Sequence, residues 1–396
     1  MRFNHAAPIA LVALVFLTSG CTTREIHQNI HADKSVLTRQ WVIRSGLIWD
    51  SATKGGEFSN PLLIDNTLVF ANQTQGVVSV YPGLNLVRWR LSIEGGVMSE
   101  MLANGPYLYF GAADGNLYRV RWDNGAVEWK YALRNTVVSQ PTVSEGRLFV
   151  TTADDTVYAF DAGTGEWLWH YSRRSAQTAS VLGASKPLVD GGEVIAGLSD
   201  GTLVGLSEQE GKLKWEKQLH TGRKFTDIDA HPVLFKGTLY VPAYDGSLYA
   251  LDRTSLQIMW KFDAGASREI LVDEGKIYLS SSDGHVYCLQ RDSGKLLWSF
   301  ELDDGVPTPI VLARDLIVLG SSHQYLYALD RVTGEPLYRT SMGDGSGFYS
   351  RPIYHPETAS IYAMSASGNV YSFGLRTPRK RKFLMGSSDS YEFFYR

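Results

Sequence analysis

The sequence predicts an all-β protein, an eight-bladed β-propeller of four-stranded antiparallel blades in which an N-terminal strand closes the last blade. Three observations lead to this prediction. First, one motif recurs along the chain, and each copy ends in an aromatic residue at the same distance from the start of the motif. Second, a pair of turn-forming residues precedes each copy. Third, a tryptophan near the N-terminus belongs to no such motif. Short strands in units of this kind are typical of propellers.

In each copy of the repeating motif, an aromatic residue stands ten positions after one equivalent residue, which is an alanine in the clearest copies. The clearest copy runs from Ala159 to Trp169, and a second runs from Ala250 to Trp260. The same spacing links Ser79 to Trp89, Arg119 to Trp129, Gly205 to Trp215, Cys288 to Trp298 and Ala328 to Tyr338. Seven copies at one spacing indicate seven equivalent units.

Turn-forming pairs lie just upstream of these copies, and one more lies beyond them. They are Gln75-Gly76, Asp114-Gly115, Asp154-Asp155, Asp200-Gly201, Asp245-Gly246, Asp283-Gly284, His323-Gln324 and Ser367-Gly368. Gly, Asn and Asp accept the positive φ of tight hairpins, so the pairs predict hairpin turns between alternating strands. A second turn leads into each tryptophan strand, which makes four strands per unit.

The eighth unit lacks its tryptophan, because none stands ten residues after Ser372. Trp41 supplies the missing residue, so residues around 38–45 are predicted to form the outer strand of the last blade. This closure removes free sheet edges. Residues 40–375 number 336, which divided among eight blades gives 42 each.

The N-terminal segment predicts export and a lipid anchor. Residues 6–17 form an apolar run of 12, which is too short to span a membrane, and small residues leading to Cys21 follow it. This ending resembles a bacterial lipoprotein signal, although Thr18 replaces the usual leucine, and the resemblance implies acylation of Cys21. In that family an Asp after the cysteine signals retention in the inner membrane, and Thr22 stands there, so the resemblance favours the outer membrane. The alternative is an ordinary secretory signal with a chance cysteine.

These boundaries predict four segments. They are a lipoprotein signal peptide at 1–20, a linker from lipidated Cys21 at 21–37, the propeller at 38–375 and a flexible C-terminal tail at 376–396.

Composition argues against nucleic-acid binding and against metal sites. A net charge of −3 leaves no general positive surface for phosphates. Two cysteines, Cys21 and Cys288, cannot build a disulfide framework or a cysteine-rich metal site, and the nine histidines are scattered along the chain. Cys288 occupies the position of Ala159 and Ala250, which predicts a small buried residue.

The motif from Tyr158 to Trp169, Tyr-Ala-x-Asp-x-x-Thr-Gly-x-x-x-Trp, resembles the repeat of pyrroloquinoline-quinone-type propellers. The resemblance implies that each repeat tryptophan docks against the neighbouring blade. The predicted docking residues are Trp41, Trp89, Trp129, Trp169, Trp215, Trp260 and Trp298. It does not imply the cofactor, because function resides in sites and not in folds.

The first residue of each inner strand should line one mouth of the central channel. Counting back from the turn pairs gives Asn60, Glu100, Gln140, Lys186, His231, Glu269, Thr308 and Arg351. A quinone-dependent dehydrogenase resembling this fold needs oxygen ligands for Ca²⁺, a stacking tryptophan and a pair of adjacent cysteines. The chain has no adjacent cysteines and its ring carries mixed charge, so we expect a solvated rim with no cofactor, no metal and no catalytic residue.

Two neighbouring connections between blades are longer than most of their counterparts. Trp169 to Pro187 spans 18 residues and Trp215 to Pro232 spans 17, whereas Trp129 to Pro141 spans 12. Long loops on a rigid scaffold often carry function, and tolerated insertion is the alternative.

A lipoprotein signal followed by an eight-bladed propeller resembles the BamB family, lipoproteins of the outer-membrane β-barrel assembly machinery. The local match is best across 225–279, where Phe225-Thr-Asp-Ile-Asp-Ala-His-Pro-Val is similar to a family loop ending in Asp-x-Asp.

The resemblance implies a non-catalytic scaffold on the periplasmic face of the outer membrane. Such a scaffold binds periplasmic domains of the central barrel-assembly protein within its complex. The implied partner-binding residues are Ala179, Val181, Leu182, Asp227 and Asp229; Leu182 replaces a family arginine, so the resemblance does not extend to that ion pair. The alternative function is a periplasmic quinoprotein-like dehydrogenase or a ligand-binding propeller.

Overall fold

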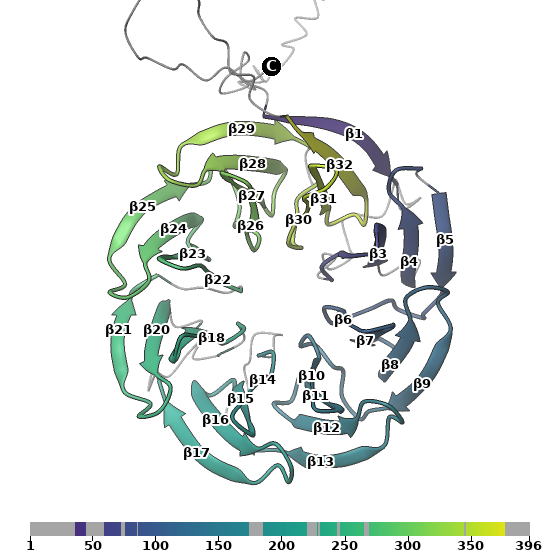
Figure 1. Cartoon of the computed structure of the whole chain (residues 1–396), viewed down its shortest axis with the longest axis vertical. Helices are drawn as coiled ribbons and strands as arrows, with labels where there is room; N and C mark the ends of the chain where they lie inside the picture. The colour runs from purple at the N-terminus through teal and green to yellow at the C-terminus, as the bar shows by residue number, and fades with distance from the viewer. Residues whose placement is uncertain are drawn as a thin grey trace, which may run out of the picture.

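The computed structural model describes residues 36–44, 59–72, 76–84, 86–173, 185–219, 228, 230–243, 246–264, 269–343 and 346–376. Within these residues the chain forms 32 strands in eight four-stranded antiparallel sheets and no helix. Figure 1 shows the sheets arranged as blades around a central axis. The predicted fold class is confirmed.

Each blade has an inner, a second, a third and an outer strand, named here in the order of blades 1 to 8. The inner strands are β2 (Leu62–Ile64), β6 (Leu102–Asn104), β10 (Thr142–Ser144), β14 (Leu188–Asp190), β18 (Val233–Phe235), β22 (Leu271–Val272), β26 (Val311–Ala313) and β30 (Ile353–His355). The second strands are β3 (Thr67–Asn72), β7 (Tyr107–Gly111), β11 (Arg147–Thr151), β15 (Glu193–Gly197), β19 (Thr238–Ala243), β23 (Lys276–Ser280), β27 (Leu316–Gly320) and β31 (Ser360–Met364).

The third and outer strands complete the blades. The third strands are β4 (Gly76–Tyr81), β8 (Asn116–Arg121), β12 (Val157–Asp161), β16 (Thr202–Ser207), β20 (Ser247–Asp252), β24 (His285–Gln290), β28 (Tyr325–Asp330) and β32 (Val370–Leu375). The outer strands are β5 (Leu86–Leu91), β9 (Val127–Ala132), β13 (Trp167–Tyr171), β17 (Leu213–Gln218), β21 (Ile258–Phe262), β25 (Leu296–Glu301), β29 (Pro336–Ser341) and, for blade 8, β1 (Leu37–Ile43).

The hydrophobic core lies between the blades. In blade 4 the third strand β16 is buried at every position but its last, whereas the outer strand β17 is exposed or half-buried throughout. Strands that neighbours cover on both faces read as continuous apolar runs, because both sets of alternating side chains meet other side chains.

The ten-residue spacing of the motif is the pairing register of the third and outer strands. Ala159 pairs directly with Trp169 and Ala250 with Trp260, and a bulge follows each alanine. The spacing in the sequence is constant because the backbone is: each turn has the same length and each bulge has the same position.

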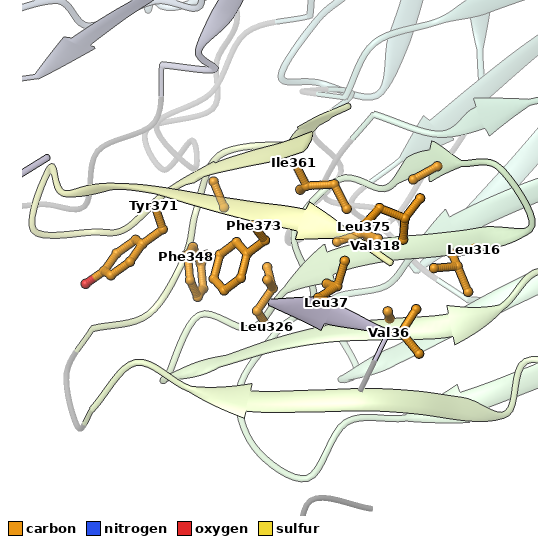
Figure 2. Packing of buried hydrophobic residues seen from close by; sticks show 13 residues of the cluster. Val36, Leu37, Leu316, Val318, Leu326, Phe348, Ile361, Tyr371, Phe373 and Leu375 are labelled. Carbon is orange, nitrogen blue, oxygen red and sulfur yellow. The ribbon is translucent and has the colours of Figure 1, made fainter. Parts of the chain in front are cut away.

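The last blade is closed by the N-terminal strand. β1 pairs antiparallel with β32, and Trp41 stands opposite Ser372 at the same register as the other pairs. Val36 and Leu37 share a buried cluster with Phe373 of β32 and with Val318 of blade 7, as Figure 2 shows. The predicted closure is confirmed.

Five of the repeat tryptophans lie against a glycine of the next blade. The pairs are Trp89 with Gly125, Trp129 with Gly165, Trp169 with Gly211, Trp260 with Gly294, and Trp298 with Gly334. A Cβ on any of these glycines would lie 2.4–2.7 Å from the indole. Three indoles also donate Nε1–H to a backbone carbonyl of the next blade, at 2.9–3.3 Å. We propose that these contacts hold each blade against the next. Trp41 packs in a hydrophobic cluster shared by blades 8 and 1.

Trp215 is arranged differently. The glycine position of blade 5 is taken by Leu256, which keeps the positive φ of 55°. Trp215 lies instead on Gly205 of its own blade and donates Nε1–H to Glu193 at 2.9 Å. Arg253 of blade 5 stands 6.0 Å from its ring and forms an ion pair with Glu193. At this seam an arginine crosses between the blades.

Gly165 allows a test of the docking geometry with a matched control. Gly165 and Gly146 both have φ near +77°, but a Cβ at Gly146 would meet nothing within 4 Å. Gly146→Ala should therefore lower the free energy of unfolding by only about 1 kcal/mol, because alanine is strained in the left-handed backbone conformation. Gly165→Ala should cost about 2 kcal/mol more, because its Cβ overlaps Trp129. Urea denaturation measures both, and equal losses would mean that the indole moves aside at no cost.

Candidate functional site

The described residues that flank the predicted partner-binding segments lie on one face of the ring. We call it the loop face; it carries the connections from each outer strand to the next inner strand. The two long connections join β13 to β14 and β17 to β18. The predicted residues Ala179, Val181, Leu182, Asp227 and Asp229 all lie outside the described residues, so the structure places only their flanks.

Ile228 stands between the two predicted aspartates and is buried. Its N–H donates to the carbonyl of Leu198 at 3.1 Å, and its side chain belongs to a cluster with Val241. Gly197 leaves room for it, since a Cβ there would lie 2.3 Å from Ile228 Cγ2. Ile228 therefore fixes this connection to blades 4 and 5.

Sequence reasoning did not identify Ile228 as an anchor, although a signal was present. Buried apolar residues stand three positions before the ring residue in other blades, such as Val97 before Glu100 and Val137 before Gln140. Ile228 stands three positions before His231.

The two long connections end side by side at the channel mouth. The backbone N–H of Lys186 donates to Nδ1 of His231 at 3.3 Å, and Lys186 Nζ donates to Gln140 Oε1 at 2.5 Å. At the start of the first connection, Arg173 forms an ion pair with Glu216 at 3.2 Å. These contacts tie blades 3, 4 and 5 together around the predicted binding segments.

One member of the predicted channel ring is wrong by one position. Thr308 Oγ1 accepts the N–H of Gly320 at 2.9 Å, just as Ser139 Oγ accepts the N–H of Thr151. Thr308 is thus equivalent to Ser139, and Pro309 occupies the ring position. In most blades a proline follows the ring residue, but in blade 7 the proline is the ring residue itself, so the residue before it, Thr308, is not in the ring.

The ring side chains form a charged network across the mouth. Arg351 pairs with Glu269 at 2.7 Å, and its backbone N–H donates to Asn60 Oδ1 at 2.6 Å. Burial, followed by the nearby Glu269 carboxylate, raises the pKa of Glu100 to about 7. Burial also lowers the pKa of Lys186. Although Glu100 is partly exposed as a residue, its Oε2 atom is buried and has no hydrogen-bond partner.

This network does not fit a quinone with Ca²⁺. A hard cation prefers an all-oxygen shell, whereas Lys186 and Arg351 set positive charges beside the two carboxylates. The described part of the chain contains no group of three or more His, Cys, Asp or Glu side chains able to hold a metal. Cys288 is buried and burial raises the pKa of its thiol to about 11, so it stays protonated and is a poor nucleophile.

The predicted lipid attachment site, Cys21, lies outside the described residues, as do the rest of the predicted signal segment and residues 377–396 of the tail. Among the residues that are described, no helix is long and apolar enough to cross a membrane.

Comparison with known proteins gives one consistent family. A family model described as outer membrane protein assembly factor BamB matches residues 45–300 and 245–382. The BamB protein of Salmonella typhimurium is 35% identical over 100 residues, which are 24% of this chain and 26% of that protein. The chain thus aligns with about a quarter of the length of this curated relative.

Solved structures share the fold. The crystal structure of BamB from Moraxella catarrhalis superposes with a TM-score of 0.72 at 22% identity, covering 86% of this chain and 100% of that chain. A quinohemoprotein alcohol dehydrogenase from Comamonas testosteroni superposes with a TM-score of 0.69 at 15% identity, covering 92% of this chain and 80% of that chain. At these identities the likeness concerns the fold alone.

Proposed function

The chain belongs to the family of outer membrane protein assembly factor BamB, and on this basis we propose that it is a non-catalytic scaffold of the machinery that assembles outer-membrane β-barrel proteins. The observation that carries the proposal is the family match, which runs from residue 45 to 382 and so covers every strand of the propeller except β1. The scaffold binds periplasmic domains of the central assembly protein and so joins its complex.

The partner-binding surface comprises the two long connections on the loop face. Ala179, Val181 and Leu182 supply apolar area from the first connection, and Asp227 and Asp229 supply carboxylates from the second. The flanking contacts support this assignment, because Lys186 and His231 bring the ends of the two connections together and Ile228 anchors the second.

The scaffold is held at the periplasmic face of the outer membrane by acyl chains on Cys21. The signal-like N-terminus and the family assignment support this part of the proposal. The alternative, a quinoprotein-like dehydrogenase or ligand-binding propeller, is disfavoured by the lysine and arginine in the channel mouth.

The binding surface is tested by replacing Asp227 and Asp229 together with alanine. We expect association to weaken by about 2 kcal/mol, roughly 30-fold, because truncating hydrogen-bonded charges at an interface typically costs that much. Thermal stability should not change. Calorimetry against the periplasmic domains of the central assembly protein from the same organism measures the loss.

The matched control is Glu210→Ala with Asp292→Ala. These side chains are 58% and 74% exposed on the opposite face, so the pair removes the same charge away from the proposed site. The pair Val181→Asp and Leu182→Asp tests the apolar part. Full binding by both loop variants would remove this surface from the proposal.

A further inference from the structure

Exposed apolar side chains concentrate on the face of the ring opposite the loop face. We call this face the turn rim; it carries the turns that join each third strand to its outer strand. Of the 14 large hydrophobic side chains exposed among the described residues, 13 lie between the end of a third strand and the second residue of the outer strand. They are Tyr81, Leu84, Leu86, Val87, Val127, Trp167, Leu168, Leu213, Ile258, Met259, Leu296, Leu297 and Val332, each 40–69% exposed. The fourteenth, Met98, lies on the loop face.

Packing within the repeat does not require these side chains to be apolar. The position just before the repeat tryptophan is Leu168 in blade 3, Met259 in blade 5 and Leu297 in blade 6. The same position carries Arg88, Glu128 and Lys214 in blades 1, 2 and 4. Because polar residues fit this backbone position equally well, the apolar ones have another cause. Exposed apolar side chains that gather on one face of a protein are a feature of interaction sites.

Both ends of the propeller leave from this same rim. Blade 8 has no turn there, since its third and outer strands come from opposite ends of the chain. Leu37, the first residue of β1, pairs with Leu375, the last residue of β32, and the N–H of Arg376 donates to the carbonyl of Val36 at 2.9 Å. Val36 and Arg376, where the described chain begins and ends, therefore lie side by side on the turn rim, in the blade at the top of Figure 1.

The sequences before Val36 and after Arg376 point to a lipid surface. Cys21 is 15 residues before Val36, a span of at most roughly 50 Å even when fully extended. After Arg376 the chain carries four consecutive basic residues, Arg379 to Lys382. A basic cluster next to a membrane is attracted to anionic lipid headgroups, and each lysine or arginine adds to the attraction.

We propose that the turn rim is the membrane-facing side of the propeller and rests its exposed apolar side chains on a phospholipid surface. The proposal rests partly on the anchor at Cys21 proposed above. Apolar contact with the interface binds a protein weakly, but a short tether keeps the rim at high local concentration and makes weak contact sufficient. The loop face then points away from the membrane, where it is free to bind its partner.

The test uses protein without acyl chains, so that it is independent of the anchor. Cys21→Ser protein is floated with vesicles of phosphatidylethanolamine and phosphatidylglycerol at 3:1, and with phosphatidylcholine vesicles. We expect partition into the first vesicles, and weaker partition into the second, which lack anionic headgroups. Met259→Glu and Leu297→Glu should each lower partition about tenfold, since each removes several buried carbon atoms from the interface. Both variants should fold, because blade 2 already carries Glu128 at this position.

Met98→Glu is the matched control, since it adds the same charge to an exposed apolar position on the loop face. It should change partition by less than twofold. A second measurement attaches the chain from Cys21 onward to maleimide lipid through that thiol, with Cys288 protected by burial. Brominated lipids should then quench tryptophan fluorescence, and Trp167→Phe should reduce the quenching.

Three results would overturn the proposal. The first is an absence of both flotation and quenching, and the second is an equal loss in Met98→Glu and Met259→Glu. The third is a concentration-dependent dimer in sedimentation that Met259→Glu dissociates, which would assign the rim to a second copy of the chain. Failure of the anchor is seen separately, as retention of washed Cys21→Ser protein in the outer membrane of cells.

Discussion

Replacing Trp169 with alanine is expected to lower the free energy of unfolding by about 3–5 kcal/mol, the usual cost of truncating a large buried aromatic side chain. Trp169 is only 6% exposed and belongs to the apolar cluster between blades 3 and 4. Its indole lies on Gly211 and donates to the carbonyl of Glu208 at 3.1 Å, so truncation opens a cavity and leaves a carbonyl without its donor. Both losses fall on one seam between blades.

Chemical denaturation monitored by circular dichroism measures this change. Trp167→Ala is the control, because Trp167 lies two residues earlier in the same strand but is 47% exposed. It should cost less than about 1 kcal/mol, as is usual for surface substitutions. If the two variants unfold at the same denaturant concentration, the repeat tryptophan does not hold the seam together.

Replacing Cys21 with serine is expected to move the protein from the membrane fraction to the soluble periplasm. A lipoprotein cysteine carries several acyl chains, whereas even one chain binds a membrane only marginally, so losing all of them removes stable anchoring. The rim contact alone is weak and should be lost when membranes are washed at high salt, which screens the basic cluster. Fractionation after osmotic release of the periplasm follows the change.

Cys288→Ala provides the control for this experiment. Alanine is the natural residue at the equivalent positions Ala159, Ala250 and Ala328, so the variant should fold and remain with the membrane. Retention of washed Cys21→Ser protein in the outer membrane would argue against a lipid anchor at this residue.

The fold could be predicted from the sequence because its main signal is a pairing register. The spacing from Ala159 to Trp169 is a direct cross-strand pair, and the unpaired Trp41 identified the partner of Ser372 and hence the ring closure. Such a signal depends only on turn length and backbone pairing. The spacing is therefore kept even where the small residue opposite the tryptophan is replaced by a large one, as it is by Arg119.

Side-chain placement was harder to predict, because equivalent sequence positions do not imply equivalent contacts. Trp215 has the repeat spacing, yet Leu256 stands where the other seams have glycine and the indole lies on its own blade. The proline of blade 7 shifted the predicted ring residue from Pro309 to Thr308. At the candidate site, chain length indicated the two long connections, but the anchoring role of Ile228 depends on tertiary packing.

The pairing of β1 with β32 also governs the order in which the ring is completed. Leu37 and Leu375 are 338 positions apart, so bringing them together costs roughly 5 kcal/mol of chain entropy, against far less for the short hairpins within a blade. The hairpins can form as soon as their residues are available, whereas the closing strand has no partner until residue 375 has been made. Until then the apolar faces of blades 7 and 1 that meet blade 8 stay uncovered, and the unfinished ring is the form most exposed to aggregation.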